Sequence, residues 1–539
     1  EQWKSQDLPA QIIEARADAE PFVFFEGPPT ANGRPGIHHV FSRTLKDSMC
    51  RFQTMQGKRV MRKAGWDTHG LPVELEVEKQ LGISGKPDIE KHGLGPFNKL
   101  CRESVFTYKS EWQSLSQRIG YELDYENPYV TFDNDYVESV WFLLSRYAAN
   151  DLLYQGSKVL PWCGRCGTGL SSHEVSQGYK DIDDPSVYIT FPLIDAAGDL
   201  QNAELVAWTT TPWTLPSNMA VCVHPDFEYA IIESDARRFV MLESKAAAVF
   251  GEDNYTVVGS VQGEALKGLS YTPLFTYDDG IVINEGSNRH IVVADSFVSD
   301  DDGTGMVHMA PYGADDFRIA QANDIFAMLA VGEDARFISD VATVSAGTFF
   351  RDANKDLSRD LKERGRMLKV SQCNHSYPHC WRCETPLMHF PAPAWFLRTT
   401  AYKDKMIEQN KQIKWAPPEI GEGRFGEWLE NNIDWALSRD RFWGTPLPVW
   451  INEDDEDDWI CIESFAQLGE LSGGLPDNFD PHRPMVDDIT FETPTAGKSG
   501  TMRRVAQVID CWFDSGAMPL AQHHWPFENR ELVAEQFPA

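Results

Sequence analysis

The fold of this chain is decided near its beginning, where residues 22–39 read FVFFEGPPTANGRPGIHH. The apolar run Phe22–Phe25 predicts a short buried strand, and the glycines and prolines after it predict a turn. Beyond the loop, apolar residues recur at helical spacing from Phe41 to Met55, so we expect a helix to begin near His39. A strand, a glycine-rich loop and a helix form the opening of a nucleotide-binding α/β unit.

This loop has the features of a phosphate site. Backbone N–H groups at a helix N-terminus bind anions, and glycines such as Gly33 and Gly36 let the backbone approach a ligand closely. His38 and His39, at the start of the helix, could donate hydrogen bonds to phosphoryl oxygens in a transition state. A glycine and proline turn with two surface histidines explains the same residues equally well, because glycine-rich loops are common.

Composition limits the class of protein. The chain has 539 residues, with 49 basic and 81 acidic side chains and a formal net charge of −32. It is long enough for several domains, and its 42% hydrophobic and 24% charged residues are typical of a globular protein. No run approaches the ~18 apolar residues of a membrane helix, and the start does not resemble a signal peptide. We therefore expect a cytoplasmic protein with no membrane partner, and not one that coats nucleic acid along its whole surface.

A second motif, GWDTHGLP, occupies residues 65–72 and follows the β-type run Arg59–Met61. Ligands of open α/β sheets bind at the carboxyl ends of the strands, which is where this motif is expected. The carboxylate of Asp67 could hold a substrate ammonium group there. An aspartate that merely caps the following helix is the more common use of such a residue.

The middle of the chain has a different pattern of residue types. From about residue 186 to 350, β-type runs alternate with glycine and aspartate, which predicts an inserted, mostly β domain. It lies between two Cys-x-x-Cys pairs. Together the pairs make a four-cysteine set suited to tetrahedral, structural zinc, although four unligated core thiols would also fit the sequence. The predicted ligands are Cys163, Cys166, Cys380 and Cys383.

Six motifs, taken in order, resemble the class I aminoacyl-tRNA synthetases, and among them the isoleucine enzymes of the eukaryote-like type. They are GPPTANG from residue 27, GWDTHGLP from 65, WTTTPWTLP from 208, YPHCWR from 377, DWALSRDRFWG from 434 and WFDSG from 512. The valine and leucine enzymes typically carry Thr-Thr-Arg-Pro where this chain has Thr-Thr-Thr-Pro-Trp. The resemblance implies an α/β Rossmann-like catalytic domain with an inserted, mostly β editing domain on a zinc-ribbon stem.

The same resemblance implies where the domains begin and end. The implied bounds are 1–155 for the first half of the catalytic domain, 156–184 for the outgoing stem, 185–371 for the editing domain, 372–390 for the returning stem and 391–539 for the second catalytic half, with small insertions at about 450–505.

For synthesis, the resemblance implies that ATP with Mg²⁺ activates L-isoleucine and that the acyl group passes to the acceptor end of tRNA(Ile). Asn32, Gly36 and His39 would bind ATP, with His38 and His39 as the catalytic pair. Pro28, Asp67 and Trp512 would form the amino-acid pocket, and Asp67 would pair with the α-ammonium group. The chain departs from the family's His-x-Gly-His motif, because Gly36-Ile37-His38-His39 exchanges the first His and the Gly. We expect the His38 imidazole to reach the triphosphate by another path.

For editing, the resemblance implies a hydrolytic pocket that removes valine from tRNA(Ile). One methylene is worth only about 1–3 kcal/mol of discrimination, a figure for which this enzyme family is itself the standard example. Asp316 would anchor the α-ammonium group of the valyl product. The implied pocket residues are Thr209, Thr210, Thr211, Asn218, His308 and Asp316. Without the resemblance, a solvated β domain with threonines in strands and aspartates in turns would explain these residues.

The family's Lys-Met-Ser-Lys-Ser loop is absent, and Thr501–Arg504 does not replace it, having neither Lys nor Ser and preceding the Trp512 motif. We therefore expect a monomeric piece of a longer protein, lacking that loop and the anticodon-binding domain and poorly active in synthesis. A non-catalytic tRNA- or regulator-binding paralogue is a second hypothesis. A stand-alone deacylase is a third, which the motifs around Asp67 and Trp512 disfavour because a deacylase has no use for them.

Overall fold

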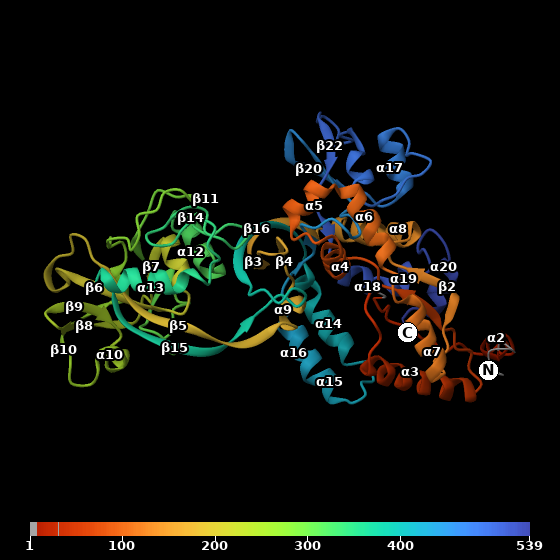
Figure 1. Ribbon diagram of the computed structural model, residues 1–539, viewed down its shortest axis with the longest axis horizontal. Helices are drawn as coiled ribbons and strands as arrows, with labels where there is room; N and C mark the ends of the chain where they lie inside the picture. The colour runs from red at the N-terminus through yellow and green to blue at the C-terminus, as the bar shows by residue number, and fades with distance from the viewer. Residues whose placement is uncertain (1–7, 31, 539) are drawn as a thin grey trace. The chain divides into compact units, whose positions relative to one another are not determined.

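Contacts within the computed structural model, which describes residues 8–30 and 32–538, divide the chain into two units (Figure 1). The first unit combines Glu1–Gly156 with Ala394–Ala539, and the second is Ser157–Pro393. In sequence, the second unit is therefore an insertion into the first. Among the described residues, no helix is both long and apolar enough to cross a membrane.

The N-terminal part of the first unit alternates helices with a small parallel sheet. Strand β1 pairs in parallel with β2, and the extended segment from Pro21 to Thr30 runs parallel to residues 59–67. The elements are α2 (Leu8–Glu14), α3 (Ile37–Met55), β1 (Lys63–Trp66), α4 (Leu71–Leu81), α5 (Lys86–His92), α6 (Leu94–Ser104), α7 (Lys109–Ile119), β2 (Asp124–Val130) and α8 (Asn134–Ala148).

The sequence predicted two strands and one helix in this region, with different outcomes. The buried strand predicted at Phe22–Phe25 is wrong, because only the ends of the segment are bridged and its phenylalanines are half-buried. The strand expected at Arg59–Met61 is instead β1, which starts at Lys63 and leads directly into Asp67. Helix α3 is confirmed, but the apolar side chains that predicted it point to solvent, with Phe41 68% exposed.

The C-terminal part of the first unit adds short helices and an antiparallel sheet of order β20-β19-β22-β21. The elements are η3 (Thr399–Tyr402), α14 (Lys403–Asn410), α15 (Glu419–Glu422), α16 (Arg424–Glu430), β17 (Trp435–Ala436), β18 (Ser438–Arg439), β19 (Val449–Asn452), β20 (Asp455–Cys461), α17 (Phe465–Ser472), η4 (Met485–Asp488), β21 (Thr490–Glu492), β22 (Thr501–Arg504), β23 (Val508–Ile509), α18 (Cys511–Gly516), α19 (Met518–Ala521) and α20 (Arg530–Gln536).

The second unit is mostly β. Strands β3 (Leu153–Cys163) and β16 (Met388–Leu397) carry the chain out of the first unit and back. Its other elements are β4 (Thr168–Gly169), α9 (Ser172–Ser176), β5 (Tyr179–Pro192), η1 (Gly198–Leu200), β6 (Ala203–Thr209), η2 (Pro212–Ser217), β7 (Ala220–Val223), β8 (Glu228–Ser234), β9 (Arg237–Met241), α10 (Glu243–Phe250), β10 (Thr256–Gln262), α11 (Gly263–Leu266), β11 (Ile281–Glu285), β12 (Ile291–Ala294), β13 (Met306–Met309), α12 (Ala314–Ala322), β14 (Phe326–Leu329), α13 (Ala353–Glu363) and β15 (Met367–Pro378).

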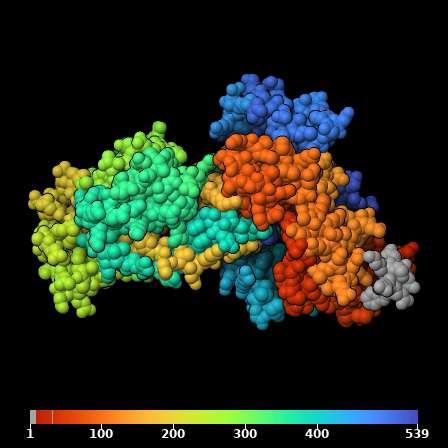
Figure 2. Space-filling view, viewed as in Figure 1, coloured from red at the N-terminus to blue at the C-terminus, as the bar shows by residue number. Residues whose placement is uncertain are grey.

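Two sheets frame the second unit. A six-stranded sheet has the order β10-β8-β9-β6-β5-β15, and a three-stranded sheet has the order β12-β7-β13. The long strands β5 and β15 run side by side (Figure 1), and atoms of this part of the chain form the surface there in Figure 2. The predicted boundary between residues 184 and 185 falls inside β5. Apolar side chains from the strands fill the core, among them Val187, Ile189, Phe191, Leu205 and Val240.

Candidate active sites

The first candidate site lies at the start of α3. Its N-cap is Gly36, whose N–H donates to Nδ1 of His39 over 2.8 Å. The His39 ring also packs on Trp112, with ring centroids 4.6 Å apart, and Trp112 donates its indole N–H to the Gly33 carbonyl. Burial, followed by the charge of His38, lowers the pKa of His39. A neutral His39 that accepts at Nδ1 carries its proton on Nε2, where it can donate to a phosphate oxygen.

The structure shows how His38 and Gly36, the two exchanged residues of the motif, are arranged. The rings of His38 and His39 lie 3.8 Å apart. A Cβ added at Gly36 would lie 2.8 Å from Cε1 of His38, so the His38 ring folds back over the glycine. The imidazole therefore occupies space beside residue 36 that a side chain at that position would need. Asn32 is half-buried in the same loop, whereas its neighbour Ala31 lies outside the described residues.

The predicted amino-acid pocket draws on two distant segments. Asp67 follows β1, and its backbone N–H donates to the Pro29 carbonyl over 3.0 Å, next to half-buried Pro28. Helix α18 carries Trp512, whose backbone N–H is capped by the side chain of Asp510. Ser515 on this helix donates its hydroxyl to Oδ2 of Asp67 over 3.0 Å. The structure thus brings the Asp67 loop and the Trp512 helix together.

Four of the six predicted editing residues form one hydrogen-bonded cluster in the second unit. The hydroxyls of Thr209, at the end of β6, and Thr211 lie 3.1 Å apart. Thr211 is linked through Thr214 to His308 on β13. His308 is in turn bonded to Asn218, while Thr210 lies half-buried between the two clustered threonines.

The hydrogen bonds in this cluster have a fixed direction. Nδ2 of Asn218 faces the Ala220 and Met309 carbonyls, so this nitrogen also donates to Nδ1 of His308, over 2.8 Å. His308 therefore carries its proton on Nε2 and donates it to the Thr214 hydroxyl over 3.0 Å. Burial lowers the pKa of His308 to about 3, so the ring is neutral at physiological pH. It holds its neighbours in place and is not a free base.

Asp316, the remaining predicted residue, lies in the first turn of α12. Its Oδ2 accepts the backbone N–H of Ala310 over 3.0 Å, two residues beyond His308. Burial raises the pKa of Asp316 to about 7. A carboxyl group with this pKa is ready to ionise when a cationic ligand arrives.

The four predicted zinc ligands lie together in the second unit. The sulfur atoms of Cys163, Cys166, Cys380 and Cys383 all lie within 4.8 Å of one another, and those of Cys163 and Cys383 are 3.5 Å apart. Four thiolates around tetrahedral zinc, with Zn–S of about 2.3 Å, would have sulfur atoms about 3.8 Å apart. The donor set and its spacing therefore fit zinc.

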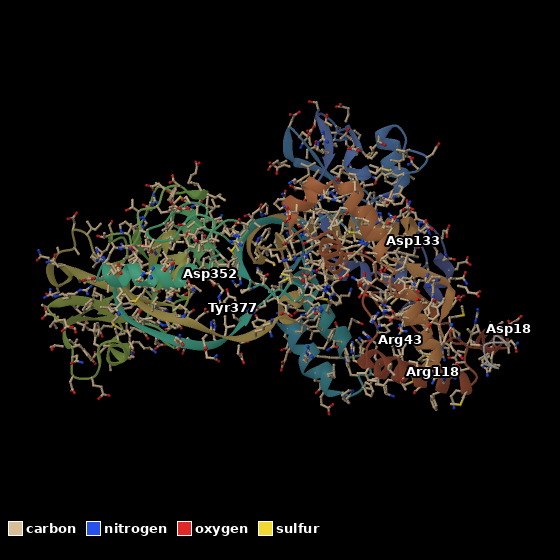
Figure 3. All side chains as sticks on the ribbon, in the orientation of Figure 1. Asp18, Arg43, Arg118, Asp133, Asp352 and Tyr377 are labelled. Carbon is tan, nitrogen blue, oxygen red and sulfur yellow. The ribbon has the colours of Figure 1, made fainter. Side chains whose placement is uncertain are left out.

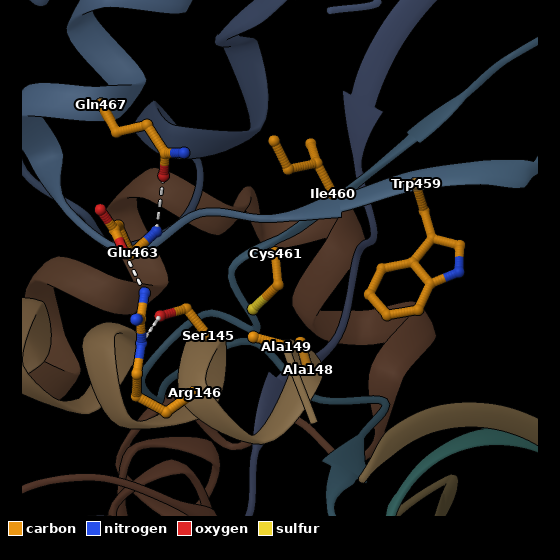
Figure 4. A pocket seen from close by; sticks show the side chains of 9 residues that line it. All are labelled: Ser145, Arg146, Ala148, Ala149, Trp459, Ile460, Cys461, Glu463 and Gln467. Carbon is orange, nitrogen blue, oxygen red and sulfur yellow. Dashed lines mark hydrogen bonds and ion pairs between the residues drawn. The ribbon is translucent and has the colours of Figure 1, made fainter. Parts of the chain in front are cut away.

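A small pocket of about 340 Å³ in the first unit lies apart from these sites. Arg146, Trp459 and Cys461 are among its lining residues, and none of the predicted site residues lines it (Figure 4). Burial raises the pKa of Cys461, which makes its thiol a poor nucleophile.

Sequence reasoning missed several residues of these sites. One is Trp112, and another is Tyr271, which donates its hydroxyl to Oδ1 of Asn218 over 2.7 Å. Neither gave a signal, because an aromatic residue at helical or strand spacing is usually part of a core. Ser515 belongs to a quoted motif but had no assigned role, and the same is true of His69. His482, described below, lies in a polar loop far from any motif.

Comparison with known proteins places these sites in context. The model of the family "tRNA synthetases class I (I, L, M and V)" matches residues 1–539. The isoleucine–tRNA ligase of Clostridium acetobutylicum is 45% identical over 538 residues, which are 100% of this chain and 50% of that protein. That of Thermus thermophilus is 46% identical over 540 residues, again 100% of this chain and 50% of that protein. The chain spans about half the length of the curated relatives it matches.

Proposed function

Because the chain belongs to the class I tRNA synthetases of the isoleucine, leucine, methionine and valine group, we propose that it is the catalytic and editing part of an isoleucine–tRNA ligase. Its fold is the mixed helix and sheet fold of that family. The single observation that carries the choice of isoleucine is the 45% identity, across the whole chain, with proteins named isoleucine–tRNA ligase.

In the proposed reaction, the carboxylate of isoleucine attacks the α-phosphate of ATP and pyrophosphate leaves. A ribose hydroxyl of the terminal adenosine of tRNA(Ile) then attacks the acyl carbon of the adenylate, and AMP leaves. Asp67 pairs with the α-ammonium group, while Pro28 and Trp512 pack on the branched side chain. Ser515 supports this role, because its hydrogen bond fixes one carboxylate oxygen of Asp67.

At the phosphates, Asn32 and the backbone at Gly36 bind ATP, which arrives with Mg²⁺. His39 donates from Nε2 to a phosphoryl oxygen as negative charge develops during attack. The His38 ring lies beside Gly36, the position at which the family's motif has its first histidine. This position supports the expectation that the His38 imidazole reaches the triphosphate despite the exchanged motif.

In the proposed editing reaction, Asp316 holds the α-ammonium group of valine attached to tRNA(Ile), and Thr209, Thr210 and Thr211 orient the attacking water. His308 and Asn218 hold the threonine loop in place through the directed hydrogen bonds described above. Zinc held by the four cysteines would join the outgoing and returning segments of the stem within the second unit. We further propose that the protein is a cytoplasmic monomer.

The test is isoleucine-dependent ATP–pyrophosphate exchange by the product of the complete coding sequence, with valine as the competing amino acid, together with hydrolysis of valyl-tRNA(Ile). Exchange that favours isoleucine, combined with deacylation, is the expected result. Absence of any exchange would contradict the proposal and favour a non-catalytic tRNA-binding protein.

A further inference from the structure

A buried pair of histidines joins segments of the first unit that lie far apart in sequence. His69 follows Asp67 in the loop after β1, and His482 lies in the loop before η4. Their Nε2 atoms are 2.8 Å apart, which is hydrogen-bonding distance. His69 is 0% and His482 3% exposed, so water does not compete for this contact.

Each ring also faces a carboxylate at its other nitrogen. Nδ1 of His69 lies 3.1 Å from Oδ2 of Asp514 on α18, and Nδ1 of His482 lies 2.5 Å from Oδ1 of Asp480. Thr445 donates to the second oxygen of Asp514, and Arg102 donates to the second oxygen of Asp480. The result is a continuous chain of polar groups, from a buried carboxylate on α18 to a partly exposed one.

The positions of the protons along this series of hydrogen-bonded groups determine the charge of the histidine pair. Nδ1 of His482 also lies 3.0 Å from Nη2 of Arg102, which can only donate. The Asp480 oxygen is the closer partner at 2.5 Å, and Arg102 already donates to the other oxygen of Asp480. Because an ionised carboxylate only accepts, the closer contact places a proton on Nδ1 of His482, as Asp514 does on Nδ1 of His69. If both rings were neutral, their Nε2 atoms would then present two lone pairs to each other at 2.8 Å, which is repulsive. The contact is a hydrogen bond only if the pair holds one more proton. The two rings together therefore carry one positive charge.

We propose that His69 and His482 share this additional proton and form a charged clamp that positions the Asp67 loop against the Trp512 helix. The charged side chains facing the clamp are Asp514 on α18, Asp480 and Arg102 around His482, and Asp133, which precedes α8 and is labelled in Figure 3. Two carboxylates in direct contact with the rings stabilise the extra charge.

The environment also determines which ring carries the charge. Burial lowers the pKa of His482 to about 4. His482 is therefore the neutral partner that accepts at Nε2, and His69 is the imidazolium that donates. Trp443 packs on both rings, nearly parallel to His482 at 4.9 Å and edge-on to His69 at 5.4 Å, which fixes their orientation.

The histidine pair also positions Asp67 in the amino-acid pocket, a role that rests on the proposed function. His69 is two residues beyond Asp67, and Asp514 is next to Ser515, which itself donates to Asp67. The His69–Asp514 pair and the Ser515–Asp67 bond are thus two parallel links between one loop and one helix. His482 acts on the pocket only through His69, which makes it a positioning residue.

Nitrogen NMR of the chain with ¹⁵N-labelled histidine tests the shared proton without any activity measurement. At neutral pH, His69 should give the signals of a doubly protonated ring, and His482→Leu should abolish them. Two neutral rings in the unsubstituted chain would overturn the proposal, whether or not the protein is a synthetase.

Kinetics of isoleucine-dependent exchange, in the product of the complete coding sequence, tests the positioning role. His482→Leu removes the acceptor for His69 and should raise the KM for isoleucine about tenfold, the effect of losing one hydrogen bond to a charged group, while kcat changes less than about twofold. His482→Gln offers an amide oxygen to His69 and should restore KM to within about twofold. The matched control is His92→Leu, which makes the same change at an exposed position at the end of α5 and should leave both constants unchanged.

The possible outcomes separate the two proposals. An inactive unsubstituted protein contradicts the proposed function, and the NMR result alone then decides the shared proton. An active protein whose His482→Leu variant keeps its KM, or loses only kcat together with thermal stability, overturns the positioning role. Failure of glutamine to rescue would also overturn it, because the amide oxygen supplies the acceptor that the mechanism requires.

Discussion

If Asp316 anchors the α-ammonium group as proposed, hydrolysis of valyl-tRNA(Ile) should depend on pH through the ionisation of this carboxyl group. Its carboxyl group has a pKa of about 7 in the free chain, so about a tenth is ionised at pH 6, half at pH 7 and nine tenths at pH 8. Only the ionised form pairs with a substrate ammonium group. The ionised fraction of Asp316 rises about tenfold from pH 6 to pH 8. The value of kcat/KM for hydrolysis of valyl-tRNA(Ile) should therefore rise from pH 6, and it should level off and fall near pH 8 as the substrate amine, whose ordinary pKa is about 7.7–8.0, loses its proton.

Asp316→Asn keeps the shape of the side chain and removes the charge. Loss of a hydrogen bond to a charged group costs about 1.5–3 kcal/mol, so kcat/KM at pH 8 should fall roughly 10- to 100-fold, and the rise between pH 6 and pH 8 should disappear. Isoleucine-dependent exchange should be unaffected. Asp315→Asn is the matched control, because Asp315 is the exposed neighbour of Asp316. The charge of Asp315 contributes to the raised pKa of Asp316 after burial, so this variant should keep the acidic limb and shift it slightly toward lower pH. The reasoning fails if Asp316→Asn keeps the acidic limb or if Asp315→Asn loses it.

The same carboxyl group makes the stability of the fold depend on pH. Its pKa is higher in the folded chain than the ordinary value of about 3.9, so the folded state favours the protonated form. The stabilisation by that proton is complete below pH 4 and is lost as the pH rises through about 7. Asp316→Asn should therefore melt at a higher temperature than the unsubstituted chain at pH 8, and the difference should shrink toward pH 5.

Three further predictions follow from the other sites. Gly36→Ala places a methyl group 2.8 Å from the His38 ring and should reduce isoleucine-dependent exchange at least tenfold. Tyr271→Phe leaves a buried amide oxygen without its donor and should lower the free energy of unfolding in urea by about 1–3 kcal/mol while slowing deacylation more than exchange. Cys166→Ser should reduce the zinc content from one atom per chain, measured by elemental analysis, and lower the melting temperature of the editing unit.

The place of a motif in the fold could be predicted from the sequence where the motif directly follows a strand. The Asp67 motif comes directly after a strand, and the threonines at residues 209–211 end another. Such positions are predictable because the end of a strand and the side chains that follow it are encoded within a few residues. The cysteine pairs are equally local, since two ligands in each pair occupy one turn.

Helix α3 shows what the spacing of apolar residues cannot predict. The spacing of Phe41 and the apolar residues after it predicted the helix correctly, and Ile37 is its first residue. Yet that apolar stripe is exposed, and the side chains that enter the protein are Arg43 and Cys50. Arg43 contacts Ser116 and the face of Trp112. A repeat of apolar residues identifies a helix, but it does not identify the surface against which the helix packs.

A comparison of His308 with His69 shows most clearly why protonation could not be predicted from sequence. His308 is surrounded by an amide and a hydroxyl, so burial alone decides and the ring is neutral. His69 is just as buried, but the carboxylate of Asp514 and the lone pair of His482 both require it to donate. His482 is 413 residues away in the chain. Opposite charge states of the same residue type thus arise from partners brought together only by folding, and in each case the charge state determines what the histidine can hold in place.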